Sequence, residues 1–264
     1  MRRFFISTLL LLASLLLLST SCEKSSKPTL KVAATSIPHA EILELIQPHL
    51  QAQNIEFEIV IIDDFNMPNR ALADREVDAN FFQHLPFLEA QQIDFGYALE
   101  SLVAVHLEPM ALYSKKHLAL EEIKEGALIA LPSDASNQAR ALTLCEEIGW
   151  VTLKTQGTKT SVLDIASNPR HLHFIEMDSP LLSRALDDVD AAFITINFAL
   201  LAGLSPQRDA LAIEKGQSRF ANIVAIRKGE QARADLHALK MALITEQIRQ
   251  FIEERYQGAI IPAF

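Results

Sequence analysis

The segment Leu131–Arg140 combines residue types that are suited to binding an anion. An apolar run ends at Leu131, side chains that cap helices follow, and Asn137 and Arg140 lie near the start of a predicted helix. The free backbone N–H groups of a first helical turn attract anions, and a guanidinium can bind a carboxylate through two parallel hydrogen bonds. The segment therefore indicates a carboxylate site that uses Arg140, unless it is a capped helix whose arginine faces water.

A second segment, Asn80–Phe87, interleaves aromatic and polar side chains. Three phenylalanines alternate with an asparagine, a glutamine and a histidine within eight residues. Small-molecule pockets have this composition, because apolar walls exclude water while a few polar groups orient the ligand. Phe82, His84 and Phe87 are therefore candidate pocket residues. The same pattern is also typical of a core strand that enters a helix started by Pro86.

Three polar residues interrupt or follow apolar runs later in the chain. Ala191–Ala199 is interpreted as a buried strand that carries Thr195 and Asn197 at its carboxyl end, and Asn222 interrupts the run Phe220–Ile226. In open α/β sheets, ligands bind beyond the carboxyl ends of the strands. These residues are therefore candidates for polar contacts with a ligand, although an asparagine in such a run is also typical of a turn.

The spacing of glycines, cysteines and charges excludes several classes of protein. The eight glycines lie at least eight residues apart, whereas a dinucleotide fingerprint, a Walker A loop and a nucleophile elbow need closer ones. Cys22 and Cys145 are too far apart for a Cys-x-x-Cys motif, and the one close histidine pair, His171 and His173, has no cysteine partner. The net charge of −9 disfavours nucleic-acid binding. We therefore expect no enzyme, no metal site and no cofactor.

The first 28 residues predict an export signal and a lipid anchor. Two arginines precede the apolar stretch Phe4–Leu18, whose 15 residues are too few to span a bilayer as a helix. Small residues and then Cys22 follow, which predicts a signal peptide over 1–21, acylation of Cys22 and a polar tether over 22–28. Ser19 stands where a lipobox usually has leucine, so simple secretion with an incidental cysteine is the alternative. Removal of the signal peptide leaves a net charge of −11.

The elements that must position these candidates alternate between apolar β-rich runs and segments of helical periodicity. Such alternation predicts an α/β fold with mainly parallel sheets flanked by helices. The expected strands cover 30–35, 57–62, 102–107, 110–114, 128–131, 172–177, 191–196, 210–213 and 223–226. The expected helices cover 39–50, 69–77, 86–93, 137–148, 181–186 and a long C-terminal segment with at most one break. Turn residues near 108–109 and 216–218 indicate two crossings, so we expect lobe I to comprise 29–107 plus 222–264, and lobe II 108–221.

Together these segments resemble the methionine-binding lipoproteins of bacterial ABC importers, the NLPA lipoprotein family. The similarity covers residues 29–264. In chain order, the matching motifs are Ala34-Thr35-x-x-Pro38-His39-Ala40-Glu41-Ile42-Leu43, Ala71-Leu72-Ala73-Asp74-x-x-x-Asp78-Ala79-Asn80-x-Phe82-Gln83-His84, His106-Leu107-Glu108-Pro109-Met110, Asn137-x-Ala139-Arg140-Ala141-Leu142, Arg184-Ala185-Leu186-Asp187-Asp188-Val189-Asp190-Ala191-Ala192 and Gly258-Ala259-x-x-Pro262-Ala263. The resemblance implies a two-lobed periplasmic binding protein of the second type, with a ligand cleft between the lobes.

The resemblance also implies roles for particular residues. Arg140 corresponds to a clamp for the ligand carboxylate. Phe82, His84 and Phe87 correspond to pocket walls. Asn222 corresponds to a ligand for the α-amino or the carboxylate group, and the residues alone do not decide between the two.

Other positions of the implied site cap a helix or depart from the family pattern. Asn137 is expected to cap its helix and to touch the ligand. The family often has tyrosine where this chain has Phe65 and Phe87, so two hydroxyl groups are absent. It usually has asparagine where this chain has Thr195, and Asn197 follows two residues later. These departures leave the amino-acid clamp intact and bear on which ligand side chain the pocket prefers.

The predicted function is that of a substrate-binding lipoprotein of an ABC importer. As a monomer, it would capture methionine or a close analogue and deliver it to a membrane permease and its ATPase. Its lipid would anchor it to a membrane of the bacterial cell envelope, facing the periplasm or the exterior. The alternatives are the same fold binding another small amino acid or a short peptide, a surface lipoprotein with an interaction role, and an envelope hydrolase that uses His84 or a histidine-bound metal.

Overall fold

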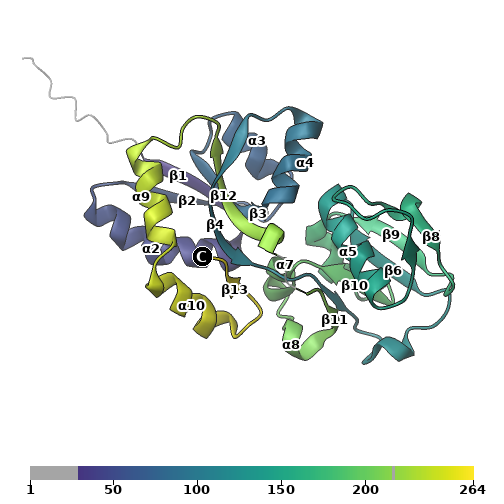
Figure 1. Cartoon of the computed structure of the whole chain (residues 1–264). Coiled ribbons are helices and arrows are strands. Elements are labelled where there is room, and N and C mark those ends of the chain that lie inside the picture. The colour runs from purple at the N-terminus through teal and green to yellow at the C-terminus, as the bar shows by residue number, and fades with distance from the viewer. Residues whose placement is uncertain (1–28, 216–217) are drawn as a thin grey trace, which may run out of the picture.

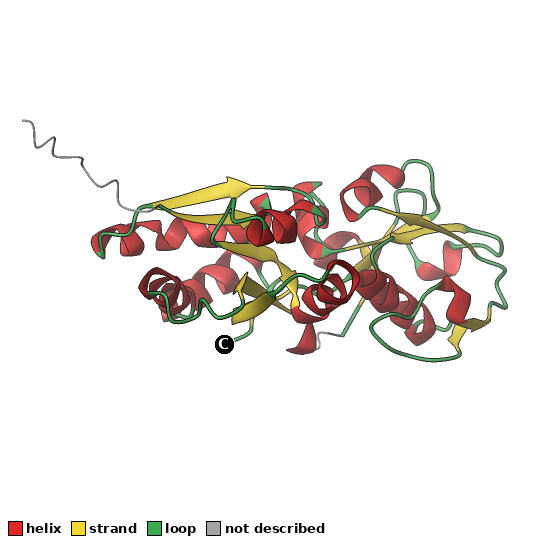
Figure 2. Ribbon diagram, turned by 90° about the horizontal axis from the view of Figure 1, so that it is seen from above, coloured by secondary structure: helices red, strands yellow, loops and turns green. Residues whose placement is uncertain are grey.

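The computed structural model describes residues 29–215 and 218–264, which form two α/β lobes side by side (Figure 1). The predicted signal peptide, Cys22, the tether and part of the predicted crossing at 216–218 lie outside these residues. The two sheets and their helices follow one another along an elongated molecule (Figure 2). In the part of the chain that the structure describes, no helix combines the length and the apolar character that crossing a membrane requires.

One lobe is built on a six-stranded sheet. In spatial order its strands are β13 (Ile261–Pro262), β4 (Leu99–Leu107), β12 (Ala221–Arg227), β3 (Ala79–His84), β1 (Leu30–Ala34) and β2 (Phe57–Ile61). A buried apolar cluster on one face involves three helices, namely α2 (Glu41–Ala52), α9 (Ala234–Leu243) and α10 (Glu246–Tyr256). The cluster on the other face involves α3 (Met67–Ala73) and α4 (Leu85–Phe95). A short helical turn, η1 (Ser36–Ala40), links β1 to α2.

The other lobe is built on a five-stranded sheet with a two-stranded sheet beside it. The five strands are, in spatial order, β11 (Ala210–Ile213), β5 (Ala111–Tyr113), β10 (Ala191–Ile194), β6 (Leu128–Pro132) and β9 (His173–Met177), and the pair comprises β7 (Thr152–Leu153) and β8 (Ile165–Ser167). One face packs against α5 (Ala135–Glu147), and the other against α6 (Leu182–Ala185) and α7 (Ile196–Leu201). The remaining helical segments are α8 (Pro206–Asp209), η2 (Leu120–Glu122), η3 (Val162–Asp164), η4 (Ser179–Leu181) and η5 (Ser218–Phe220).

Both sheets are mixed, so the expectation of mainly parallel sheets needs correction. β1 pairs in parallel with β2 and β3, and β6 pairs in parallel with β9 and β10. The antiparallel pairs come from strands that carry the chain between the lobes. β4 leaves the first lobe and β12 re-enters it beside β4, so the two strands run in opposite directions. The α/β class and the helices on both sheet faces are confirmed.

The expected strand over 191–196 is also wrong at its end. β10 stops at Ile194, and α7 begins at Ile196 with Thr195 in an extended conformation between them. The strand and the following turn are both buried, so the sequence shows one continuous apolar run with no change of period. Asn197 therefore lies in the first turn of a helix and not on the face of a strand.

Other element boundaries follow the sequence more closely. The C-terminal amphipathic segment breaks once, between α9 and α10, where the Thr245 hydroxyl accepts a hydrogen bond from the Ile248 N–H at 3.4 Å. The strand β3 and the start of α4 correspond to the alternative interpretation of Asn80–Phe87, a core strand that enters a helix started by Pro86, and all six residues of β3 are buried. The short strands β7, β8 and β13 were not expected.

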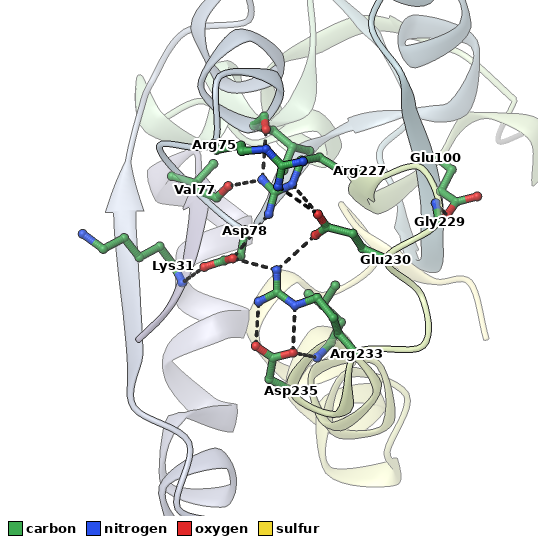
Figure 3. A network of polar contacts seen from close by, with 12 residues as sticks. Lys31, Arg75, Val77, Asp78, Glu100, Arg227, Gly229, Glu230, Arg233 and Asp235 are labelled. Atoms are coloured by element: carbon green, nitrogen blue, oxygen red, sulfur yellow. Dashed lines mark hydrogen bonds and ion pairs between the residues drawn. The ribbon is translucent and has the colours of Figure 1, made fainter. Parts of the chain in front are cut away.

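A network of ion pairs holds the carboxyl end of β12, the strand by which the chain re-enters the first lobe (Figure 3). The Arg227 guanidinium donates to the Val77 carbonyl at 2.6 Å and lies 3.4 Å from the Asp78 carboxylate. Arg233 donates to the same carboxylate at 2.8 Å, and Glu230 pairs with both arginines at 2.8 and 3.0 Å. The network ties β12 to the chain just before β3, and so helps to fix the strand that carries Asn222 at its other end.

Candidate ligand-binding site

A pocket lies between the two lobes, and its empty space, counted together with the open solvent at its mouth, is about 310 Å³. The lining residues are Phe65, Phe82, Gln83, His84, Phe87, Glu108, Asn137, Arg140, Thr195, Asn197 and Asn222. The structure thus brings together all nine residues proposed from the sequence, and it adds two that were missed, Gln83 and Glu108. Their contacts with a ligand remain a prediction.

The turn from β3 into α4 positions one side of the pocket. His84 is the N-cap of α4, and its Nδ1 accepts a hydrogen bond from the Phe87 N–H at 3.1 Å. Its Nε2 lies 3.1 Å from Asn137 Oδ1, on the other lobe. Burial, reinforced by the positive charge of Arg140, lowers the pKa of His84 to about 3. His84 is therefore a neutral imidazole at physiological pH, and it links β3 to α5 across the pocket.

Aromatic rings form the apolar wall. The Phe65 ring lies 5.8 Å from that of Phe82 and 5.7 Å from that of Phe87, measured between centroids, and Phe82 and Phe87 are 5.7 Å apart in an edge-on arrangement. Phe198 of α7 packs against Phe65 at 4.9 Å, which supports the wall from the second lobe. The edges and faces of such rings suit a flexible apolar or thioether side chain.

Arg140 is buried, at 4% exposure, and four of its five N–H groups donate to other groups of the protein. Its Nη2 donates to Glu214 at 2.7 Å and to the Glu108 carbonyl at 2.8 Å, and its Nε donates to Glu214 at 3.2 Å. Its Nη1 donates to Asn137 Oδ1 at 3.1 Å. The sequence suggested that Arg140 would bind a ligand carboxylate through two parallel bonds, but Glu214 takes that face of the guanidinium. Among the described contacts, one N–H group on Nη1 is left for a ligand.

Glu214 was not recognised from the sequence. Its carboxylate also accepts a hydrogen bond from the Met110 N–H at 3.0 Å, so Glu214, which follows β11, joins the residue before β5 to α5. A buried arginine needs a partner, because an unpaired charge away from water is costly. The sequence marks Glu214 only as a polar residue after a predicted strand.

Glu108 places a buried carboxylate in the pocket, at the point where the chain leaves β4 for the second lobe. Its Oε1 lies 2.7 Å from His106 Nε2 and 3.3 Å from His39 Nε2, and its Oε2 accepts a hydrogen bond from the Asn197 N–H at 3.2 Å. Burial raises the pKa of Glu108, and the nearby His39, Asn197 and Arg140 oppose that shift. Glu108 belongs to a motif that carried the family resemblance, but nothing in its spacing indicated a pocket residue.

Three polar side chains at the pocket have hydrogen-bonding atoms without a partner. Thr195 Oγ1 and both amide atoms of Asn197 are buried and make no hydrogen bond within residues 29–215 and 218–264. Asn222 accepts a hydrogen bond at Oδ1 from His39 Nε2, at 3.3 Å, and its Nδ2, which is not fully buried, makes no hydrogen bond within the same residues. Buried polar groups are normally satisfied, so the unpaired atoms of Thr195 and Asn197 indicate a polar ligand that both donates and accepts hydrogen bonds.

The side chains of His39, His106 and Glu108 form the one described group whose atoms lie close enough to chelate a metal, within 4.8 Å of one another. Imidazole nitrogens and a carboxylate oxygen are typical zinc ligands. Here both Nε2 atoms instead face the Glu108 carboxylate, at hydrogen-bond distance for His106. The histidine pair considered in the sequence, His171 and His173, is exposed on both members. We therefore treat the buried group as a hydrogen-bonded assembly.

Two α/β lobes with a polar, aromatic-walled pocket between them define a class, the substrate-binding proteins of membrane transporters. The model of the NlpA lipoprotein family matches residues 30–264, and the chain belongs to that family. This confirms both the resemblance seen in the sequence and the two-lobed fold that it implied.

Individual relatives agree with the family assignment. The methionine-binding lipoprotein MetQ of Bacillus subtilis is 37% identical over 271 residues, which cover 99% of each chain. A nutrient binding protein from Burkholderia cenocepacia, solved bound to methionine, is 34% identical with a TM-score of 0.86, over 89% of this chain and all of that one. An ABC transporter periplasmic substrate-binding protein from Coxiella burnetii is 42% identical with a TM-score of 0.84, over 89% and 100% of the two chains.

Proposed function

We propose that this protein captures methionine between its lobes and delivers it to the permease and ATPase of an ABC importer, acting by binding alone and as a monomer. The observation that carries the proposal is the composition of the pocket: a buried carboxylate, amide donors beside a guanidinium N–H, and an aromatic wall. An amino acid offers the three complementary groups, namely an ammonium, a carboxylate and a side chain. Relatives named as methionine-binding, or solved with methionine, support this ligand.

We assign the ligand groups from charge and hydrogen-bonding capacity. The ammonium pairs with Glu108, because Arg140 is already neutralised by Glu214 and leaves Glu108 as the net negative charge of the pocket. The ligand carboxylate takes the remaining Nη1 N–H of Arg140 and the Nδ2 group of Asn222. The thioether lies against the aromatic wall, where each sulfur–ring contact contributes about 0.3–1.5 kcal/mol.

The affinity that such a site can reach is sufficient to capture methionine from dilute solution. Methionine has about nine non-hydrogen atoms, and the best small ligands gain about −1.5 kcal/mol per atom. The ceiling is therefore about −13 kcal/mol, which corresponds to a dissociation constant of about 1 nM or slightly below. Tight capture needs no covalent chemistry.

We propose the lobe boundaries that the sequence suggested, 29–107 plus 222–264 and 108–221. The six-stranded sheet supports the first set and the five-stranded sheet the second. Contacts that form only when the lobes meet would then include His84 with Asn137, and Lys159 with Asp94 at 3.5 Å. A ligand that touches both lobes favours closure because it binds the closed arrangement better.

Isothermal titration calorimetry of the mature chain with methionine tests the proposal, together with mass spectrometry of small molecules released from freshly purified protein. We expect saturable binding of one methionine per chain. Tighter binding of another amino acid or a short peptide would keep the fold and change the ligand. Failure of all amino acids and peptides to bind would favour an interaction role, and turnover of a bound compound would favour the hydrolase alternative.

Methionine binding should weaken as the pH falls towards the carboxyl range. Burial raises the pKa of Glu108 above its usual value, and a bound ammonium favours the ionised form, so a proton must leave Glu108 on binding at low pH. Affinity is then full above that raised pKa and is lost as the pH falls through it. Of the other titratable groups beside Glu108, His39 and His106 have pKa values of about 3, below this range, and burial raises the pKa of Tyr256 above it.

Calorimetry between pH 7.5 and 4.5, in buffers of different ionisation enthalpy, measures both the affinity and the proton release. Glu108→Gln is the matched control and should show neither pH effect. An affinity of the native chain that stays constant over this range would contradict the assignment of the ammonium to Glu108.

We propose that Cys22 carries the lipid that holds the protein to a membrane of the cell envelope. In bacteria that process lipoproteins, Cys22→Ala should move the protein from the membrane fraction to the soluble fraction and abolish palmitate labelling. Cys145→Ala is the control, because Cys145 is the other cysteine of the chain and is buried. Membrane association of Cys22→Ala that persists after signal-peptide cleavage would refute the anchor.

A further inference from the structure

Two histidines lie directly beneath the pocket without lining it. His39 comes from η1 and His106 from β4, and both side chains are fully buried. Their ring centroids are 5.0 Å apart, and the ring of Phe81 packs edge-on against each, at 4.5 and 5.4 Å. These packing contacts alone would explain two apolar residues here, but not two imidazoles.

The hydrogen bonds of His39 determine where its proton lies. Its Nε2 faces two acceptors, Glu108 Oε1 and Asn222 Oδ1, each at 3.3 Å. An imidazole nitrogen that faces two oxygen acceptors must carry hydrogen, so Nδ1 is the unprotonated nitrogen. The Thr35 hydroxyl, 2.6 Å from Nδ1, is then the donor of that bond. Both histidines have pKa values of about 3, chiefly because of burial, so each ring carries a single proton.

The same reasoning applies to His106. Its Nε2 lies 2.7 Å from Glu108 Oε1, and its Nδ1 has no partner in the described part of the chain. The proton is therefore on Nε2, and His106 is the closest donor to the carboxylate. Together with the Asn197 N–H on Oε2, Glu108 has donors on both oxygens before any ligand arrives.

His39 also determines which way the amide of Asn222 points. Because Oδ1 accepts from His39, the NH₂ group is the end of the amide left for the pocket. A terminal NH₂ can donate to a carboxylate and cannot accept from an ammonium. The sequence left open which of the two groups Asn222 binds, and this orientation favours the carboxylate.

We infer that His39 and His106 are positioning residues for amino-acid binding: His106 holds the Glu108 carboxylate towards the ligand ammonium, and His39 joins Glu108 to Asn222 and so couples the ammonium and carboxylate subsites. The inference rests on the proposed function. It adds that one buried group sets both polar subsites: hydrogen bonds join His39 to Thr35 and to Asn222 and join His106 to Glu108, and His39 Nε2 also lies 3.3 Å from the Glu108 carboxylate.

Ligand analogues separate positioning from a structural role. Methionine carries both polar groups, methioninol lacks the carboxylate, and 4-(methylthio)butanoate lacks the ammonium. We expect His106→Leu to weaken methionine and methioninol by about tenfold or more, because hydrogen bonds to a charged group are strong, and to leave 4-(methylthio)butanoate within about twofold. His39→Leu should weaken both analogues, because His39 contacts both subsites. Calorimetry on the full mature chain gives these affinities.

Glutamine variants test whether an N–H donor at these two positions restores ligand binding. A glutamine side chain can place an N–H near the position of the imidazole Nε2, so His39→Gln and His106→Gln should bind all three ligands within about threefold of the native chain. His237→Gln is the control, because His237 is exposed on α9. Losses that are equal for the three ligands, or glutamine variants as weak as the leucine variants, would overturn the inference in favour of a packing role.

A measurement on the native chain covers the case in which a leucine variant does not fold. In ¹⁵N-histidine NMR spectra, assigned with the two glutamine variants, both rings should be neutral with the proton on Nε2 between pH 5 and 8. A proton on Nδ1 of either ring would refute the assembly. If the native chain binds none of the three ligands while the spectra show the expected tautomers, the proposed function fails and the hydrogen-bond assignment stands.

Discussion

Glu108→Gln is expected to weaken methionine binding by about thirtyfold or more. The side chain is nearly isosteric, so the change removes the negative charge and keeps the shape of the pocket. Removing one partner of a buried, hydrogen-bonded charge pair costs about 2–5 kcal/mol, and about 2 kcal/mol corresponds to about thirtyfold. Most of the loss is the penalty of burying an ammonium that no longer has a counter-charge.

Calorimetry at pH 7.5 measures the effect, with Glu89→Gln as the control because Glu89 is exposed on α4. The analogue 4-(methylthio)butanoate, which has no ammonium, should bind Glu108→Gln at least as well as it binds the native chain, since its carboxylate no longer meets a second negative charge. Equal losses for methionine and for this analogue would show that the carboxylate of Glu108 does not select the ammonium.

The sequence was informative where a function depends on residues close together in the chain. The β3–α4 turn and the start of α5 each concentrate aromatic, amide or basic side chains within a few positions, and both segments line the pocket. The helix that carries Arg140 begins at Ala135, two residues before the predicted start, and its N-cap is Asp134, whose carboxylate accepts a hydrogen bond from the Asn137 N–H at 2.9 Å. The expectation that Asn137 caps this helix is therefore wrong, because Asn137 lies within the first helical turn.

The side-chain contacts that determine the charges and hydrogen bonds of the site could not be predicted from the sequence in the same way. Glu214 is 74 positions from Arg140, and Asn222 is 183 positions from His39. Nothing local distinguishes Glu214 from a solvated glutamate, because its role depends on where the second crossing between lobes places β11. From the sequence alone, Arg140 is therefore interpreted as an unpaired residue that binds the ligand carboxylate. In the structure it is one member of a buried ion pair with Glu214.

The ion pair between Arg140 and Glu214 gives the second prediction, which separates the contribution of Arg140 to stability from its contribution to methionine binding. Arg140→Met should lower the free energy of unfolding by about 3–5 kcal/mol, because it leaves the Glu214 carboxylate buried without its partner. It should also weaken methionine binding at least tenfold, since the Nη1 donor and the anchor for Asn137 are lost. Urea denaturation gives the first quantity and calorimetry the second.

Adding Glu214→Gln distinguishes the two roles of the arginine. The double variant removes the unpaired charge, while the glutamine oxygen can still accept from the Met110 N–H. We expect it to recover most of the lost stability and none of the lost affinity, because the carboxylate of the ligand still lacks its guanidinium donor. Arg70→Met is the control: that arginine pairs with Asp74 on the surface of α3, and its loss should cost less than about 1 kcal/mol. A double variant that binds methionine as tightly as the native chain would mean that Arg140 is only a structural partner of Glu214, and the ligand carboxylate would then have to be held by the amides of Asn222 and Asn197.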